Sequence, residues 1–140
     1  MLKNSVTVYT TQTKAGWGTY KIIDISTSSL TSMLSVKAGS SFTYHSHALR
    51  NESWPITSDE GKVILDGKEQ TVKQGNCIFI KSGVKHSLQV KSDMQLIEVQ
   101  TGKEISKDDK EVFFDCTFIV TFQYLFCWGI NGILKYKVGK

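Results

Sequence analysis

Short segments in which hydrophobic and polar residues alternate make up most of the chain, separated by turns rich in glycine, asparagine and aspartate. Alternation with a period of two places successive side chains on opposite faces of a β-strand. The predicted strands are residues 5–10, 19–25, 32–36, 62–65, 69–72, 77–80, 87–90 and 94–99. Strands this short and closely spaced predict an all-β sandwich or barrel of antiparallel sheets. A doubly wound α/β fold is excluded, because no helical segment lies between the strands.

Two connections carry a more specific prediction. Asp66 and Gly67 separate two predicted strands, and this pair suits the positive φ angles of a two-residue hairpin turn. Residues 102–110 are polar and charged, so we expect a loop or a short terminal helix there.

The composition indicates one domain in a reducing compartment. A chain of 140 residues is long enough to bury a core of its own. The net charge of +4 is spread along the chain without a basic, aromatic-rich run, so nucleic acid is not an expected partner. The three cysteines lack CxxC spacing and follow no secretory leader, which favours free thiols in the cytoplasm. Cys77 lies on a predicted strand, where we expect its thiol to be buried and inert.

The three histidines and one glutamate form a candidate metal site. His45 and His47 are two residues apart, so on a strand both imidazoles point to the same face. The turn-like residues 48–51 can bring Glu52 to that point, and His86 enters another strand after a turn. Three imidazoles and one carboxylate suit a single divalent ion, with zinc the first choice and Fe, Mn, Ni or Co as alternatives. Three unrelated, hydrogen-bonded histidines would explain this spacing less well.

Two glycine-anchored motifs resemble those of the cupin superfamily. They are carried by Gly39, His45, His47 and Glu52 in the first motif, and by Gly75, Lys81-Ser82-Gly83 and His86 in the second. The resemblance implies a double-stranded β-helix, also called a jelly-roll barrel, in which the three histidines and the glutamate are the metal ligands. Asp59 stands where the first motif closes with glycine, and Gly61 follows two residues later. Because aspartate tolerates left-handed conformations better than most residues, we expect a shifted turn here.

The resemblance narrows to the type II mannose-6-phosphate isomerase cupins, which also form the C-terminal half of bifunctional mannose-1-phosphate guanylyltransferases. It covers about residues 14–113 and rests on Gly16-Trp17-Gly18-Thr19-Tyr20, Arg50-Asn51-Glu52-Ser53-Trp54 and residues 96–102. His45 departs from the family, since those isomerases usually have glutamine there. We predict a single cupin domain over residues 1–115 and a C-terminal extension over residues 116–140.

The resemblance implies a sugar-phosphate isomerase that moves a proton between C1 and C2, with the metal as Lewis acid. Two other functions stay open because fold alone does not determine activity. One is a non-catalytic cupin that binds a sugar or nucleotide sugar. The other is a metal-dependent dioxygenase, which His45 in place of glutamine would suit. We expect a small-molecule sugar phosphate as partner, and a homodimer that covers exposed sheet edges.

Several residues near the motif are candidates for roles in catalysis or substrate binding. Glu52 and Arg50 are the predicted catalytic residues; the planar fork of Arg50 suits phosphate oxygens, although a structural ion pair is an equal alternative. Trp54 and Lys85 are further candidates for substrate binding. Trp54 could instead belong to the core, and strand alternation turns Lys85 away from the ligands. Glu98 could point inward, but no general base is assigned.

The C-terminal segment differs in character from the rest of the chain. Residues 116–134 are nineteen consecutive uncharged residues, mostly aromatic or aliphatic. Three interpretations remain open: a packed or dimer-covering segment, an extension that is not a selected part of the domain, and a membrane anchor. The anchor is the least favoured, because polar residues and glycines interrupt the apolar run.

Overall fold

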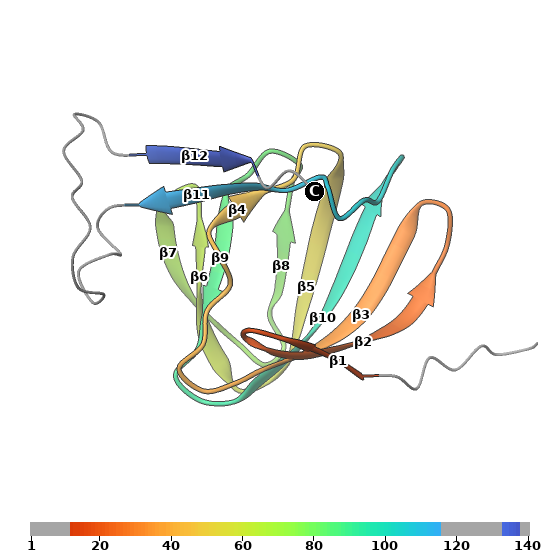
Figure 1. Cartoon of the computed structure of the whole chain (residues 1–140). Coiled ribbons are helices and arrows are strands. Elements are labelled where there is room, and N and C mark those ends of the chain that lie inside the picture. Colours follow the sequence, from red (N-terminus) through yellow and green to blue (C-terminus); the bar gives the residue numbers. More distant parts are fainter. Residues whose placement is uncertain (1–11, 116–132, 138–140) are drawn as a thin grey trace, which may run out of the picture.

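The computed structural model describes residues 12–115 and 133–137, which form two six-stranded sheets and no helix. The strands are β1 (Gln12–Ala15), β2 (Gly18–Ile25), β3 (Ser29–Val36), β4 (His45–Ser46), β5 (Arg50–Ser58), β6 (Glu60–Leu65), β7 (Lys68–Lys73), β8 (Cys77–Ile80), β9 (His86–Gln89), β10 (Met94–Gly102), β11 (Glu111–Asp115) and β12 (Ile133–Lys137). Sheet A has the order β1-β2-β3-β10-β5-β8, and sheet B has the order β12-β11-β4-β9-β6-β7 (Figure 1). The named strand pairs are antiparallel. The all-β prediction is confirmed.

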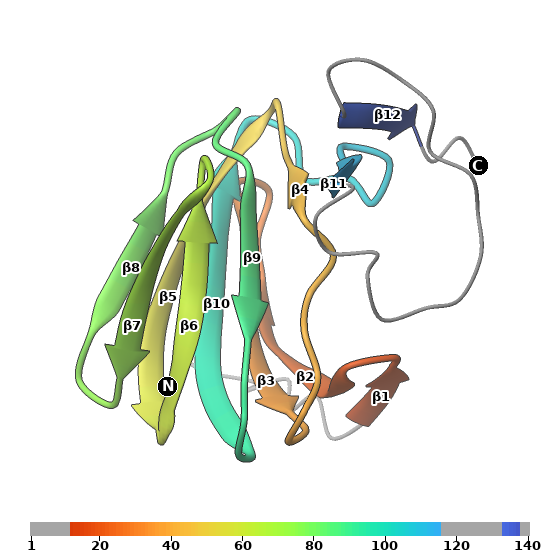
Figure 2. The same cartoon turned by 90° about the vertical axis from the view of Figure 1, so that its left-hand side faces the viewer.

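The two sheets face each other and enclose a hydrophobic core (Figure 2). Sheet A contributes Trp54 and Leu96, and sheet B contributes Val63 and Leu88, all with 0% of their surface exposed. Phe42, in the connection between β3 and β4, packs edge-on against Trp54 with 5.6 Å between ring centroids. Burial of such large apolar side chains is the main favourable term in the folding free energy, which explains why the alternating segments pack as two layers.

Strands β5 and β10 carry core residues at one end and polar residues at the other. Because side chains alternate along a strand, the same inward face changes from apolar to polar. On β5 this face carries Ile56, Trp54, Glu52 and Arg50, and on β10 it carries Met94, Leu96, Glu98 and Gln100. Glu52 and Gln100 are partners in the β5–β10 register. The polar ends of the two strands therefore lie side by side, at one end of the core.

The predicted turns are present. Asp66 has φ 46° and Gly67 has φ 80°, and Leu65 pairs with Lys68 across the two-residue turn between β6 and β7. These positive φ angles are those that the Asp-Gly pair accepts with least strain. Asp59 has φ 62°, as expected from its place at the end of the first motif. Residues 103–110 connect β10 to β11 as a loop without a helix.

Two local expectations were wrong. Cys77 lies on a strand as predicted, but its side chain is exposed, because Ile78 and Ile80 take the inward positions of β8. Cys77 and Phe79 share the outward face of β8, and Phe79 has 59% of its surface exposed. The parity of this strand is therefore set by its pairing with β5, which places Ile78 opposite Trp54 and Ile80 opposite Glu52, and not by the apolar character of its own residues. Strand β4 includes only His45 and Ser46, so His47 lies just beyond the strand and not on it.

One strand from the predicted C-terminal extension joins sheet B. Strand β12 pairs with β11, with Glu111 opposite Lys137 and Asp115 opposite Ile133. Residues 116–132 lie outside the described part of the chain, as does the predicted strand at residues 5–10, and the interpretations of both segments stay predictions. Within residues 12–115 and 133–137, no helix is long and apolar enough to cross a membrane.

Candidate metal centre

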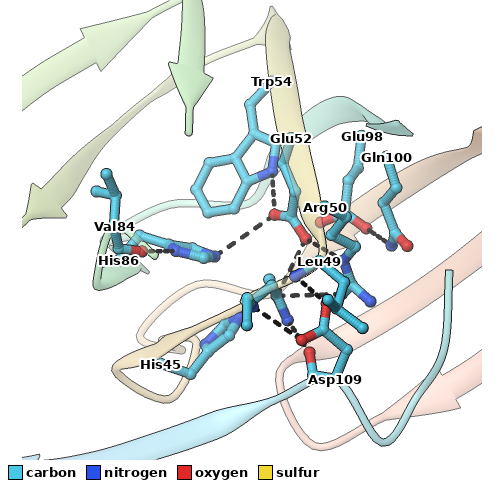
Figure 3. A network of polar contacts seen from close by, with 12 residues as sticks. His45, Leu49, Arg50, Glu52, Trp54, Val84, His86, Glu98, Gln100 and Asp109 are labelled. Carbon is cyan, nitrogen blue, oxygen red and sulfur yellow. Dashed lines mark hydrogen bonds and ion pairs between the residues drawn. The ribbon is translucent and has the colours of Figure 1, made fainter. Parts of the chain in front are cut away.

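The polar end of the sandwich brings the three histidines and Glu52 together from both sheets. His45 on β4 is directly opposite His86 on β9 in sheet B, and Glu52 projects from β5 in sheet A (Figure 3). His47 enters from the turn that follows β4. All four side chains are buried, with at most 8% of their surface exposed.

The three imidazoles and the Glu52 carboxylate lie close together. The ligating nitrogens of His45, His47 and His86 all lie within 4.8 Å of one another. The Nε2 atom of His47 is 3.1 Å from one carboxylate oxygen of Glu52, and the Nε2 atom of His86 is 3.5 Å from the other. Three imidazole nitrogens at this separation could hold one metal ion.

Each imidazole is oriented by a backbone carbonyl that accepts a hydrogen bond from Nδ1. The acceptors are Thr43 for His45 (2.6 Å), Val84 for His86 (2.9 Å) and Asp109 for His47. A proton on Nδ1 leaves the lone pair of a neutral imidazole on Nε2, the atom that points toward the other ligands. Carbonyl acceptors of this kind are typical of metal-binding histidines, because they set both the tautomer and the ring direction.

The donor set fits a divalent cation for a second reason. In the described part of the chain, the Nε2 atom of His86 is buried and has no hydrogen-bond partner. This atom lies 3.5 Å from an oxygen of the Glu52 carboxylate, and a lone pair facing a carboxylate is repulsive. Either a proton or a metal ion between the two groups removes the repulsion, and a metal ion would engage all three imidazoles at once.

The pKa values of His45 and Glu52 are both lowered at this site. Burial, followed by the positive charges of His86 and Lys110, lowers the pKa of His45 to about 2, so His45 is neutral at neutral pH. Burial would raise the pKa of Glu52, but the close approach of His47 and His86 outweighs it and holds that pKa well below its ordinary value. These are the protonation states in which both groups bind metals.

Arg50 lies beside the histidines and Glu52, and its guanidinium group also links them to the loop before β11. Its Nε donates to Glu52 (3.2 Å), one Nη donates to the carbonyl of Ser106 (3.1 Å), and the other lies 3.1 Å from Nε2 of His47. Trp54 is fully buried in the core, and its Nε1 donates to the second carboxylate oxygen of Glu52 at 3.1 Å. The two residues therefore fix the Glu52 carboxylate from two sides.

Lys85 is directed elsewhere. Its ammonium group lies 4.5 Å from the centroid of the Phe113 ring. This cation–π contact is consistent with the strand alternation that turns Lys85 away from His86.

Glu98 and Lys110 are two titratable residues of the site to which sequence reasoning assigned no role. Glu98 accepts a hydrogen bond of 2.6 Å from Gln100, and Figure 3 shows both side chains beside Arg50 and Glu52. Burial and the charge of Glu52 raise the pKa of Glu98 to about 7. Burial and the charge of Arg50 lower the pKa of Lys110. Strand parity could have identified Glu98, but no local pattern marks a lysine in the loop before β11.

Comparison with solved structures agrees with this architecture. An RmlC-like cupin from Shewanella frigidimarina superposes with a TM-score of 0.64 at 16% identity, covering 71% of this chain and 86% of that chain. The Streptomyces nucleoside dehydratase Pac13 superposes with a TM-score of 0.66 at 13% identity, covering 78% of this chain and 89% of that chain. At such identities the likeness shows the fold alone, and that fold is the cupin barrel predicted from the motifs.

Comparison of sequences is more specific. A mannose-1-phosphate guanylyltransferase from Salmonella montevideo is 31% identical over 101 residues, which cover 71% of this chain and 21% of the relative. The xanthan biosynthesis protein XanB of Xanthomonas campestris is 30% identical over 95 residues, covering 66% of this chain and 20% of the relative. The chain thus spans about a fifth of the length of these relatives. The family described as mannose-6-phosphate isomerase C-terminal matches residues 3–115. The chain therefore belongs to the mannose-6-phosphate isomerase C-terminal family of cupin domains.

Proposed function

We propose that this protein is a metal-dependent sugar-phosphate isomerase of the mannose-6-phosphate isomerase type. The observation that carries the proposal is the convergence of three imidazole nitrogens and the Glu52 carboxylate on one buried point beside Arg50, in a chain of this family. His45, His47, Glu52 and His86 would hold one divalent ion, zinc first among Zn, Fe, Mn, Ni and Co. The bound ion would supply Lewis-acid polarisation of the sugar oxygens at C1 and C2.

Arg50 and Lys110 would hold the phosphate group. Arg50 is positioned by Glu52 and Ser106, and its planar guanidinium suits phosphate oxygens. Arg50 and Lys110 are close enough for the charge of one to lower the pKa of the other. A dianionic phosphate between two such cations would relieve their repulsion, so binding is favoured by both residues.

Glu98 would carry the proton. Conversion of an open-chain aldose into a ketose removes a proton from C2 and returns one to C1, while the hydroxyl proton moves from O2 to O1. A carboxyl with a pKa of about 7 exchanges protons readily in both directions near neutral pH. Gln100 donates to Glu98 at 2.6 Å and would hold its orientation during the transfer. In this mechanism Trp54 orients Glu52, and Lys85 has no part.

The proposal includes the expected setting of the enzyme. We propose a small-molecule sugar phosphate as its partner, a homodimer as its assembly, and the cytoplasm as its location. Nucleic acid has no part in the proposal.

The decisive experiment is metal analysis of the purified chain followed by an assay of mannose 6-phosphate conversion to fructose 6-phosphate. We expect about one divalent ion per chain, loss of activity in Glu52→Gln, and a rise in KM of roughly tenfold in Arg50→Lys, since lysine keeps the charge but loses the fork. Lys85→Arg is the matched control and should leave activity unchanged.

Other outcomes would replace this proposal with another. A metal-loaded chain that binds sugar phosphates without converting them would be a binding module. Oxygen consumption by the Fe(II)-loaded chain, without isomerisation, would identify the oxidative class. An Arg50→Lys variant with unchanged KM would remove Arg50 from the substrate site.

A further inference from the structure

The loop between β10 and β11 is bound to the turn that carries His47. The carboxylate of Asp109 accepts hydrogen bonds from the backbone N–H groups of Ala48 (2.8 Å) and Leu49 (2.9 Å), one on each oxygen. The backbone carbonyl of Asp109 accepts the Nδ1–H of His47. Figure 3 shows Asp109 directly beside Leu49, below Arg50 and Glu52.

These bonds matter because little else in the described structure fixes this turn. Strand β4 ends at Ser46, so residues 47–49 have no ladder of strand hydrogen bonds. The side chains of Ala48 and Leu49 are exposed, that of Leu49 with 53% of its surface. The carbonyl of His47 accepts a hydrogen bond from Gly83 at 2.7 Å, which anchors the backbone but not the ring. Arg50 and Glu52 approach Nε2 of the His47 ring, and Asp109 holds the ring at Nδ1 on its other side.

We infer that Asp109 is a positioning residue of the metal centre, which sets the place and tautomer of His47 without itself being a ligand. The inference rests on the metal-binding part of the proposed function and does not require isomerase activity. One residue acts at three points: its two carboxylate oxygens hold the backbone on the C-terminal side of His47, and its carbonyl holds the imidazole.

The charge of the side chain is essential to this arrangement. A carboxylate accepts from two adjacent N–H groups at once, and bonds to an ionised acceptor are stronger than neutral ones. The side-chain amide introduced by Asp109→Asn could accept at only one atom, and its NH2 group would face the second N–H donor. Partners that orient metal-binding histidines typically contribute about 10–100-fold to metal affinity.

The test compares Asp109→Asn with Asp108→Asn in the full chain. Asp108 is adjacent and exposed, so its substitution changes the net charge by the same amount at the same place in the loop. Zinc affinity is measured by competition with a chromophoric chelator, and the Co(II)-loaded proteins are compared by visible absorption. We expect Asp109→Asn to weaken zinc binding by about tenfold or more and to alter the Co(II) ligand-field bands, with Asp108→Asn unchanged in both.

Each outcome has a distinct meaning. A folded Asp109→Asn chain with wild-type zinc affinity and an unchanged Co(II) spectrum would overturn the inference while leaving the metal centre intact. A wild-type chain that binds no metal would overturn both the metal centre and this inference. If Asp109→Asn does not fold, Asp109→Glu replaces it, since it keeps the charge and displaces the oxygens by one methylene. We then expect the same loss of zinc affinity in Asp109→Glu. A wild-type zinc affinity in that variant would equally overturn the inference.

Discussion

Glu52 shows how single residues at this site depend on one another. His47 and His86 approach its two carboxylate oxygens, while Arg50 and Trp54 donate hydrogen bonds to them. A carboxylate with only 2% of its surface exposed needs such partners, because its desolvation is not otherwise offset. The same N–H groups that satisfy Glu52 also fix its orientation, so the residue that would ligate the metal is held ready by its own stabilising contacts.

Glu98 carries a prediction for stability against pH. Its pKa in the folded chain is about 7 against an ordinary value of 4.5, so the folded state holds the proton more tightly than the unfolded state. Stability from this group is fully present below pH 4.5 and is lost as pH rises through 7. The shift corresponds to about 3 kcal/mol. The test measures the unfolding free energy of the metal-free chain and of the Glu98→Gln variant with urea at about pH 4.5 and at about pH 8. Between these pH values we expect the wild-type chain to lose that amount of stability relative to the variant.

The charged groups that face Glu98 are Glu52, Arg50 and Lys110, and each remains in the Glu98→Gln variant. The variant therefore isolates the titration of Glu98 from the rest of the cluster. Parallel stability curves for the two proteins would show that the Glu98 carboxyl is hydrated in solution and titrates normally.

At the scale of elements, the two glycines that flank Trp17 have very different neighbours. Gly18 opens β2 with φ 153°, and a Cβ atom added there would lie 2.0 Å from the carbonyl oxygen of Ser35 on β3. A Cβ added at Gly16 would meet nothing within 4 Å. The close approach of β2 to β3 at this point therefore requires glycine at position 18 and not at position 16.

Substitution of these glycines by alanine should separate the two cases. We expect Gly18→Ala to lower the unfolding free energy by about 3 kcal/mol or more, because the backbone of β3 must move or β2 must detach. Gly16→Ala should change it by less than about 1 kcal/mol. Chemical denaturation of the two variants measures both values. Equal effects would mean that β2 and β3 do not approach as closely as the structure shows.

At the scale of the whole molecule, a metal at this site would connect the two sheets. His45 and His86 belong to sheet B, and Glu52 belongs to sheet A. An ion that binds the folded chain and not the unfolded chain stabilises it by about 4 kcal/mol at a free concentration of about a thousand times Kd. We expect zinc to raise the melting temperature by roughly 10 °C, and EDTA to reverse the rise. If zinc raises the melting temperature of a His86→Ala variant by the same amount, the ion binds elsewhere.

The C-terminal boundary is also a property of the whole molecule. In the described part of the chain, the buried hydrophobic cluster extends from Leu34 to Leu96, and Val112 and Phe113 are also buried. Removal of residues 116–140 takes away β12 and leaves β11 as the edge of sheet B. We expect the truncated chain to stay folded by circular dichroism and to bind zinc, with a greater tendency to associate through the β11 edge. Loss of folding on truncation would place the extension within the domain.

Local patterns in the sequence were sufficient for β2, β3 and the strands from β6 to β10, for the Asp66-Gly67 hairpin and for the turn at Asp59, because strand period and turn geometry depend on neighbours in the chain. They did not predict β1, β4, β5, β11 or β12. The two motifs were sufficient for the cupin barrel and for the expectation that His45, His47, Glu52 and His86 meet. Tertiary structure alone decided the rest. Glu98 and Lys110 join Glu52 only through the pairing of β5 with β10 and the path of the following loop. Asp109 reaches the His47 turn across 60 or more positions of sequence, and side-chain proximity at that separation is set by sheet register and loop path, which no local period encodes.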